Sequence, residues 1–328
     1  MKNIFLKQCL FSFRGSALTY FSFILLCLPV LATETSDVQV QEEQKTPFEI
    51  LQESLTDQET AERKIRAFDK INVLKAELLK EEARDLNAAG KDEDASKRRE
   101  EAKALLAVVD DAYQLGLSQY GDSAVLHNFY GEFLFDIASQ VSKAVSHWQK
   151  ALRADENCAR AHNNLGMYDL HQGAYESGLS HMDKALALEP DNPTFLFNII
   201  QIYLTNYRQV MALTGMSRAE VFEKAMNLSA RSVALAPHDY QILRDYALNF
   251  FLAEDFESLP DWTKAASAWH AAGKHAPNKM EQYNTLLYEA RAHIRGDNKT
   301  EAQRCLLEAD KLLPNNALVQ ELLLKVKQ

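Results

Sequence analysis

The stretch from residue 159 to residue 192 constrains the fold more than any other part of the chain. Within its 34 residues, small side chains alternate with larger apolar ones in the pattern that two crossing helices need. Gly166 and Gly178 would let two antiparallel helices approach closely, because neither carries a side chain at the crossing. Pro190 would end the second helix, since proline lacks the amide hydrogen that continues it. The stretch therefore predicts a helical hairpin followed by another unit.

This stretch resembles a tetratricopeptide repeat, whose pattern joins a Leu–Gly pair to a later small residue, a large apolar residue, an alanine and a proline. The chain fills these places with Leu165, Gly166, Gly178, Met182, Ala185 and Pro190. The resemblance implies an all-α fold, a right-handed α-solenoid of about five helical hairpins. An N-terminal helical hairpin and a C-terminal capping helix would close its ends.

Alanine–proline landmarks set the register of the other repeats, with serine replacing the alanine once. The landmark prolines Pro190, Pro237, Pro277 and Pro314 are 47, 40 and 37 residues apart, which exceeds 34 by 13, 6 and 3. A basal period of 34 residues with insertions accounts for all three spacings. The expected repeats are residues 124–157, 158–192, 193–239, 240–279 and 280–316, within a repeat region that spans 122–316.

Insertions in repeat proteins fall on the surface. The insertion in the third repeat contains Ser217 and Glu220, which form a capping box, so we expect both helices of that repeat to be lengthened. The insertion in the fourth repeat spans residues 253–261 and contains Phe256. That aromatic would either fasten the loop onto its own helices, which is the favoured interpretation, or contact a partner.

The segments before the repeats divide into three. Residues 1–32 resemble a secretory signal peptide, with a basic start, an apolar run over 17–31 and a small residue at Ala32. Residues 33–55 are polar and acidic and predict a flexible tether. An uncleaved membrane anchor, and lipid attachment at Cys27, are the alternatives. The leader predicts an extracytoplasmic location, either a bacterial periplasm or outside the cell.

Residues 56–121 predict a helical hairpin that caps the array. Its first helix would begin at a capping box formed by Thr56 and Glu59 and end near Gly90. Residues 91–101 would form a solvated turn, and 317–328 would form the C-terminal capping helix. The expected apolar stripe of the first helix is Ile65, Phe68, Ile71, Leu74, Leu78 and Leu79; the second helix would bury Ala102, Leu105, Leu106 and Val109.

Charge and cysteine content restrict the partners. The formal net charge is −10, and removal of residues 1–32, which contain three basic residues and no acid, would leave −13. Such a chain is a poor match for a nucleic-acid backbone.

Outside the leader only Cys158 and Cys305 remain, three repeats apart, and we expect two free buried thiols. The membrane would be contacted only through the leader, and the oligomeric state is left open.

In tetratricopeptide arrays the first helix of each repeat lines a concave groove that usually holds a peptide. Asparagine suits such a groove, because its amide can both donate to and accept from a peptide backbone. Equally, Asn164 and Asn198 could merely satisfy neighbouring helix ends. The candidate groove residues are Asn128, Phe129, Glu132, Arg160, Asn163, Asn164, Met167, His171, Phe197, Asn198, Gln201, Arg244, Asp245, Tyr288 and Arg291.

Other kinds of site find little support. The clamp that holds a terminal carboxylate in some tetratricopeptide domains is missing, since Glu132 replaces one of its asparagines and Thr194 and Asn198 replace cations. His147 and His181 stand one repeat apart and are explained by repeat symmetry, so no metal is expected. No phosphate-binding loop or nucleophile motif is present, so we expect neither a cofactor nor an enzyme.

Three functions therefore remain, in order of preference. The first is an exported scaffold that binds a peptide or helix of a partner protein in the groove, in the assembly of an envelope or secretion complex. The second is a self-associating spacer or membrane-anchored assembly factor. The third is a metal-dependent enzyme that uses the histidine-bearing helices.

Overall fold

The computed structural model describes residues 45–327, so the predicted signal segment and the tether up to residue 44 lie outside the described residues. Within this range every regular element is a helix, and the predicted all-α fold is confirmed. No described helix is both long and apolar enough to cross a membrane. In chain order the elements are α2 (Pro47–Glu53), α3 (Gln58–Ala88), α4 (Asp92–Gln119), α5 (Ala124–Asp136), α6 (Val141–Ala154), α7 (Ala159–His171), α8 (Tyr175–Leu188), α9 (Pro193–Thr205), α10 (Tyr207–Thr214), α11 (Arg218–Leu235), α12 (Tyr240–Asn249), the 3₁₀ segments η2 (Phe250–Leu252) and η3 (Glu254–Phe256), α13 (Trp262–Gly273), α14 (Lys279–Arg295), α15 (Lys299–Leu312) and α16 (Ala317–Lys327).

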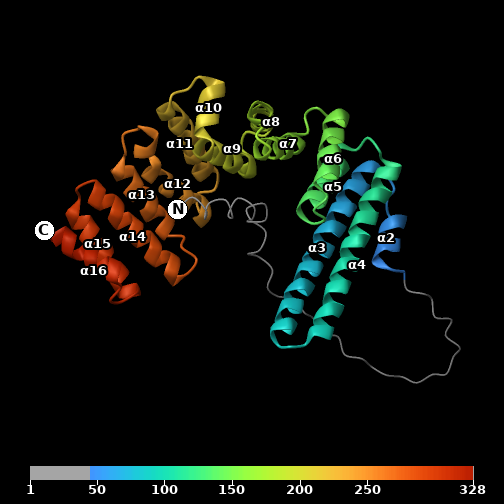
Figure 1. Ribbon diagram of the computed structural model, residues 1–328, viewed down its shortest axis with the longest axis horizontal. Coiled ribbons are helices and arrows are strands. Elements are labelled where there is room, and N and C mark those ends of the chain that lie inside the picture. Colours follow the sequence, from blue (N-terminus) through green and yellow to red (C-terminus); the bar gives the residue numbers. More distant parts are fainter. Residues whose placement is uncertain (1–44, 328) are drawn as a thin grey trace. The chain divides into compact units, whose positions relative to one another are not determined.

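Helices that follow one another along the chain pack as hairpins (Figure 1). The pairs are α3/α4, α5/α6, α7/α8, α9/α11, α12/α13 and α14/α15, and α16 packs on α15. Each hairpin also contacts the next through helices adjacent in sequence, such as α6 with α7 and α13 with α14. The described part of the chain is therefore a solenoid of helical hairpins.

The α7/α8 hairpin shows why the repeat needs its two glycines. A Cβ atom added to Gly178 would lie 3.0 Å from the carbonyl oxygen of Gly166 and 2.6 Å from Leu170 Cγ. A Cβ on Gly166 would lie 3.0 Å from the oxygen of Gly178. Both distances are too short for ordinary contact, so the two backbones meet directly. Met182 and Ala185 are buried beside the crossing and fill the rest of the seam.

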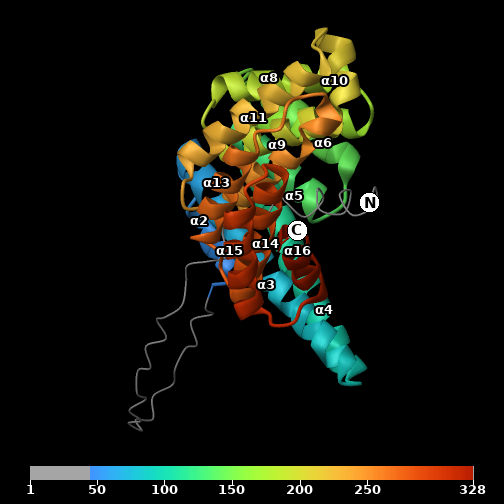
Figure 2. The ribbon, with the colours of Figure 1, turned by 90° about the vertical axis from the view of Figure 1, so that its left-hand side faces the viewer.

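The α3/α4 hairpin is longer than the repeats, with 31 and 28 residues in its helices. Its helices run side by side in both views (Figures 1 and 2). The predicted apolar stripe is only partly correct, because Ile71, Leu74 and Leu78 are each about half exposed. The helices meet through small side chains instead, which permits a closer approach than leucine would. The buried aliphatic residues along this seam are Ala61, Ile65, Val73, Ala76, Ala83, Ala95, Ala102 and Val109.

Three predicted boundaries before the repeats need correction. Thr46 and Glu49 form a capping box that begins α2, so part of the expected tether is helical. The N-cap of α3 is Asp57 rather than Thr56, because its carboxylate accepts a hydrogen bond from the Thr60 amide at 2.8 Å. The charged residues 92–101 form the first turns of α4 and not a turn before it. Three acidic residues there suit the positive end of a helix.

The two inserted segments also have helical structure. In the third repeat α9 keeps 13 residues, and the insertion forms the separate helix α10, which ends at Gly215 with a φ of 74°. The Ser217 capping box then begins the 18-residue α11, as predicted. In the fourth repeat Phe256 stacks on Phe222 of α11 at 5.2 Å and contacts Tyr207 of α10 at 5.0 Å, so it fastens the loop onto the third repeat rather than onto its own helices, and Leu259 is exposed. Only one of the two helices of the third repeat is lengthened.

Candidate functional site

The predicted groove residues lie on the first helices of the five repeats: α5, α7, α9, α12 and α14. The structure brings many of them together in two groups. One is a buried chain of amides across α5, α7 and α9. The other is an aromatic and arginine cluster around α14.

The amide chain links three successive repeats. Asn164 Nδ2 donates to Asn128 Oδ1 at 3.1 Å and to Glu132 Oε1 at 3.0 Å. On the other side, Asn198 Nδ2 donates to Asn163 Oδ1 at 3.0 Å. The four asparagines are between 1 and 7% exposed. Buried amides need partners, and these find one another across the interfaces between repeats.

This arrangement differs from both interpretations of the asparagines, namely binding of a peptide backbone and capping of neighbouring helix ends. They are not open toward an extended peptide, and they bond to side chains of neighbouring repeats rather than to helix ends. Because an amide both donates and accepts, a row of them fixes the register of one helix against the next. The amide chain therefore holds the first helices in position, and the more exposed side chains around it are the ones available for contact.

Phe129 is one of these more exposed side chains. The guanidinium carbon of Arg66, from α3, lies 3.8 Å from the centre of its ring, and that of Arg160, from α7, lies 5.4 Å away. Cations over an aromatic face are attracted by the negative charge of the ring face. Residues from the capping hairpin and the first two repeats thus meet at one aromatic ring.

A larger aromatic and arginine cluster surrounds α14, and we call it the aromatic–arginine cluster. It consists of Phe251, Trp262, Tyr288, Arg291 and Arg295. Phe251 packs edge-on against Trp262 at 5.3 Å and Tyr288 at 5.9 Å between ring centres. Arg291 lies 5.0 Å above the Tyr288 ring, and Arg295 lies 4.9 Å above the Trp262 ring. All five side chains are at least partly exposed.

Sequence reasoning identified only Tyr288 and Arg291 of this cluster. The spacing of Arg291 and Arg295, four residues apart on one helix, was a signal that both share a face. Phe251 and Trp262 flank the insertion of the fourth repeat, and the contacts that bring them to α14 depend on the tertiary structure.

The remaining predicted residues stand outside both groups. His171 is exposed at the end of α7, and Phe197 and Gln201 are partly exposed on α9. Met167 packs against an apolar core that its own repeat shares with the following repeats. Arg244 pairs with its neighbour Asp245 at 3.0 Å, although burial raises the pKa of that carboxyl more than the arginine lowers it.

Paired histidines recur between the two helices of the first two repeats. His127 Nδ1 lies 2.9 Å from His147 Nδ1, and His162 Nδ1 lies 2.8 Å from His181 Nδ1. The Nε2 atom of His127 faces the Gly121 carbonyl at 3.0 Å, and an N–H must point there. In neutral His127 the Nδ1 atom is then an acceptor, and His147 donates to it from Nδ1. Burial, together with neighbouring His127 and Lys150, lowers the pKa of His147 to about 4.

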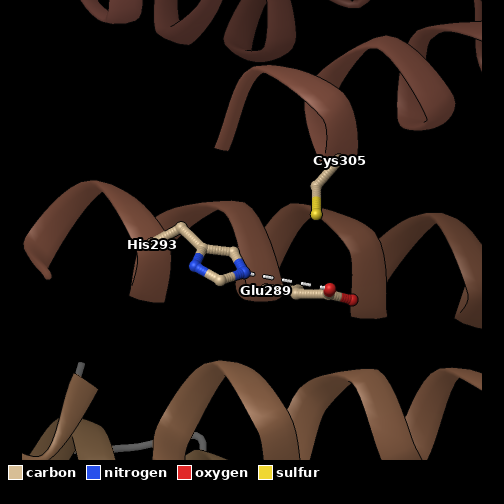
Figure 3. A group of neighbouring side chains, drawn as sticks. All are labelled: Glu289, His293 and Cys305. Carbon is tan, nitrogen blue, oxygen red and sulfur yellow. Dashed lines mark ion pairs between the residues drawn. The ribbon is translucent and has the colours of Figure 1, made fainter. Parts of the chain in front are cut away.

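Donors of the kind that bind metals gather elsewhere, between α14 and α15. Glu289, His293 and Cys305 each direct one ligand atom to a common point, and these atoms lie within 4.8 Å of one another (Figure 3). Glu289 and His293 are four residues apart, a spacing in the sequence that places both on one face of α14.

Comparison with known proteins supports the fold. No protein-family model matches the chain, and no curated protein sequence matches it. Among solved structures, the C-terminal part of a tetratricopeptide-repeat protein from Cytophaga hutchinsonii has a TM-score of 0.50 and 17% identity, and it covers 84% of this chain and 99% of its own. YrrB, described as a tetratricopeptide-repeat protein with an unusual peptide-binding site, has a TM-score of 0.49 and 16% identity over 65% of this chain and 97% of its own. The described part of the chain therefore has the fold of tetratricopeptide-repeat proteins.

Proposed function

We propose that this protein is a non-enzymatic scaffold that binds a segment of a partner protein through the aromatic–arginine cluster and the first helices beside it. The tetratricopeptide fold supports a role in protein–protein interaction. The signal-like leader supports an exported protein that acts in the periplasm or outside the cell, in the assembly of an envelope or secretion complex.

The aromatic–arginine cluster is the observation that carries this proposal. Tryptophan, tyrosine and arginine are the residue types most enriched at the energetic centres of protein interfaces. The rings of this cluster are held before any partner arrives, because Tyr288 stacks on the buried Trp269 at 4.6 Å between ring centres. A preorganised surface loses less side-chain entropy when it binds.

The charge of the cluster indicates what kind of segment it would bind. Arg295 is 44% exposed at its side chain, and its ion pair with Glu254 is long, at 3.5 Å. Arg291 and Arg295 can therefore turn to a carboxylate of the partner, while Phe251 and Trp262 receive an apolar side chain. An acidic segment with one apolar anchor, either extended or helical, fits this surface.

Capture of partners from an envelope extract tests the proposal. The double variant Arg291→Ala/Arg295→Ala is compared with the wild type and with Arg84→Ala/Arg99→Ala, two exposed arginines of the α3/α4 hairpin. The cluster variant should capture its partner roughly tenfold less, as expected for loss of an interface centre. Equal capture by all three proteins, each with wild-type helicity by circular dichroism, would contradict the proposal.

One observation favours self-association as a second candidate function. Ile71, Leu74 and Leu78 lie on one face of α3 and are 53, 51 and 52% exposed. Apolar residues at this spacing commonly meet another helix. Sedimentation equilibrium tests this, with Leu74→Lys as the variant and Lys75→Glu as its neighbouring control. A wild-type protein that stays monomeric at micromolar concentration removes this candidate.

A further inference from the structure

The cluster of donor atoms between α14 and α15 has the chemistry of a transition-metal site. Glu289 and Cys305 are 4% and 0% exposed, so both are removed from bulk water. His293 follows Glu289 by one helical turn and points its imidazole toward the carboxylate, with Nε2 4.0 Å from Oε1 (Figure 3). A carboxylate, an imidazole and a thiol thus converge from two helices.

A fourth donor comes from a third helix. His270 on α13 places Nδ1 3.3 Å from Glu289 Oε1. Its side chain is 53% exposed, which leaves this side of the cluster open to solvent. A fourth position filled by His270, or by a water molecule in its place, would complete a tetrahedral set.

Arg304 is the cation that now neutralises the buried carboxylate. One terminal nitrogen of its guanidinium lies 3.1 Å from Glu289 Oε1 and 3.4 Å from Cys305 Sγ. Its other nitrogens hold Glu301 at 2.7 Å and Glu308 at 3.0 Å. Because those two carboxylates remain bound to it, Arg304 can leave Glu289 without losing its charge partners.

We propose that Glu289, His293 and Cys305 bind a divalent ion of the zinc class, with His270 or water as the fourth ligand and Arg304 as the cation that the metal replaces. Thiolate and imidazole ligands favour zinc over magnesium or calcium, which prefer oxygen donors. Zinc bonds of about 2.0–2.3 Å in a tetrahedron separate the ligand atoms by roughly 3.3–3.8 Å. Side-chain rotation brings the ligand atoms of Glu289, His293 and Cys305, at most 4.8 Å apart, to that separation.

Binding of the metal converts a thiol to a thiolate. The S–H bond of Cys305 breaks, the S–metal bond forms, and the proton passes to solvent. No electron is transferred. The bound ion would connect α13, α14 and α15, and so would fix the last two repeats against each other.

Cobalt(II) titration of the metal-free purified chain tests the site, because a cobalt–thiolate bond gives a charge-transfer band in the near ultraviolet. We expect the band to saturate at one cobalt per chain and to disappear when zinc is added. Cys305→Ser should abolish it, and Cys158→Ser, which removes the half-buried thiol of the second repeat, should leave it unchanged. His293→Gln should weaken cobalt binding at least tenfold.

Arg304→Ala separates this site from a purely structural ion pair, and His270→Ala identifies the fourth ligand. Arg304→Ala removes the competing cation and should tighten cobalt binding, whereas the exposed Arg153→Ala should not change it. His270→Ala weakens binding if that histidine is the fourth ligand, and an unchanged affinity assigns the position to water; both outcomes keep the site.

Three results would overturn the proposal: absence of the charge-transfer band at stoichiometric cobalt, persistence of the band in Cys305→Ser, or visible cobalt bands without a thiolate band. The last result would place the ion at a histidine pair such as His127 and His147. If Cys305→Ser fails to fold, the His293→Gln variant still decides, since it leaves the thiol in place.

Discussion

Polar groups are buried between neighbouring repeats in two regions of the molecule, and the two regions satisfy them differently. Across α5, α7 and α9, asparagine amides bond to one another and to Glu132. Across α13, α14 and α15, the buried carboxylate of Glu289 relies on Arg304 and two histidines. The first region is closed, because each amide has its partners inside the protein. The second region can exchange a cation, because a metal ion from solution can take the place of Arg304 beside Glu289.

This difference assigns separate tasks to the two regions. A closed network of neutral amides holds the register of three helices and offers little to a ligand. A carboxylate balanced by partly exposed cations can respond to ions dissolved around it. The predicted groove residues divide accordingly: those in the first region are chiefly structural, and those near α14 are accessible to a partner.

The largest loss of folding stability should be similar in both regions, because each contains a hairpin whose helices pack around a buried tryptophan. Trp148 and Trp269 each stand three residues before a seam alanine and are 3% and 2% exposed. We expect Trp148→Ala and Trp269→Ala each to lower the free energy of unfolding by about 3–5 kcal/mol, measured by denaturant titration. Phenylalanine at either position should cost less. If either variant lowers the unfolding free energy by less than about 1 kcal/mol, the tryptophan in that region does not stabilise its hairpin as proposed.

Asn164→Ala probes the closed region directly. It removes the side chain that donates to Asn128 Oδ1 and accepts from Asn163 Nδ2. Buried groups without partners cost about 1–3 kcal/mol. Denaturant unfolding measures the change, and the exposed Asn227→Ala on α11 should stay within about 0.5 kcal/mol of the wild type. If both variants behave alike, the amide chain does not hold the repeats together.

Gly178→Ala tests how close the helices of the closed region approach. Its new Cβ would meet a carbonyl and a leucine, and we expect a cost of about 1–3 kcal/mol in unfolding free energy. In the fourth repeat Ala247 occupies the place that Gly166 holds in α7, so a Cβ atom is already accommodated at that crossing. Gly121→Ala is the control, because its nearest neighbour would be a carbonyl at an acceptable 3.4 Å.

The smallest effect should be a dependence on pH that originates in the histidine pairs of the first two repeats. Burial lowers the pKa of His127 and His181, and it lowers that of His147 to about 4. The low pKa of His147 also includes the effects of neighbouring His127 and Lys150. Because the folded pKa lies below the ordinary 6.5, this stability is present above pH 6.5 and is lost as the pH falls toward 4.

A series of melting temperatures between pH 7 and pH 4 measures that loss. The double variant His147→Gln/His181→Gln should have a flatter profile than the wild type, and the exposed His171→Gln should follow the wild type. Identical slopes for all three proteins would show that the histidine pairs contribute nothing to acid sensitivity.

Local sequence predicts the helical hairpins of this molecule well, because each hairpin is defined by residues less than one repeat apart. Met182, Ala185 and Trp148 are buried where the repeat pattern expects them. The α3/α4 hairpin was harder, since large apolar residues and alanines follow interleaved helical stripes. Spacing alone favours the larger side chains, whereas the alanine stripe forms the seam because it allows closer packing.

The sites were less accessible to sequence reasoning. The partner of Asn164 lies 36 residues away on another helix, and a single repeat gives no indication of which side chain it will meet. The Glu289 cluster draws on three helices, and only the pair on α14 carries a spacing signal. The sequence predicts only that Cys305 is a buried thiol. The packing of α15 on α14 is what places this thiol beside Glu289 and His293.

The pairing of each helix with its neighbour in sequence also bears on how the chain reaches this structure. Nearly all the main helix contacts join consecutive elements, and the α9/α11 pair skips only the short α10. Chains with such low contact order fold fast, because little loop entropy is lost before contacts form. Each hairpin can therefore assemble as soon as its second helix has been synthesised, without waiting for the rest of the chain.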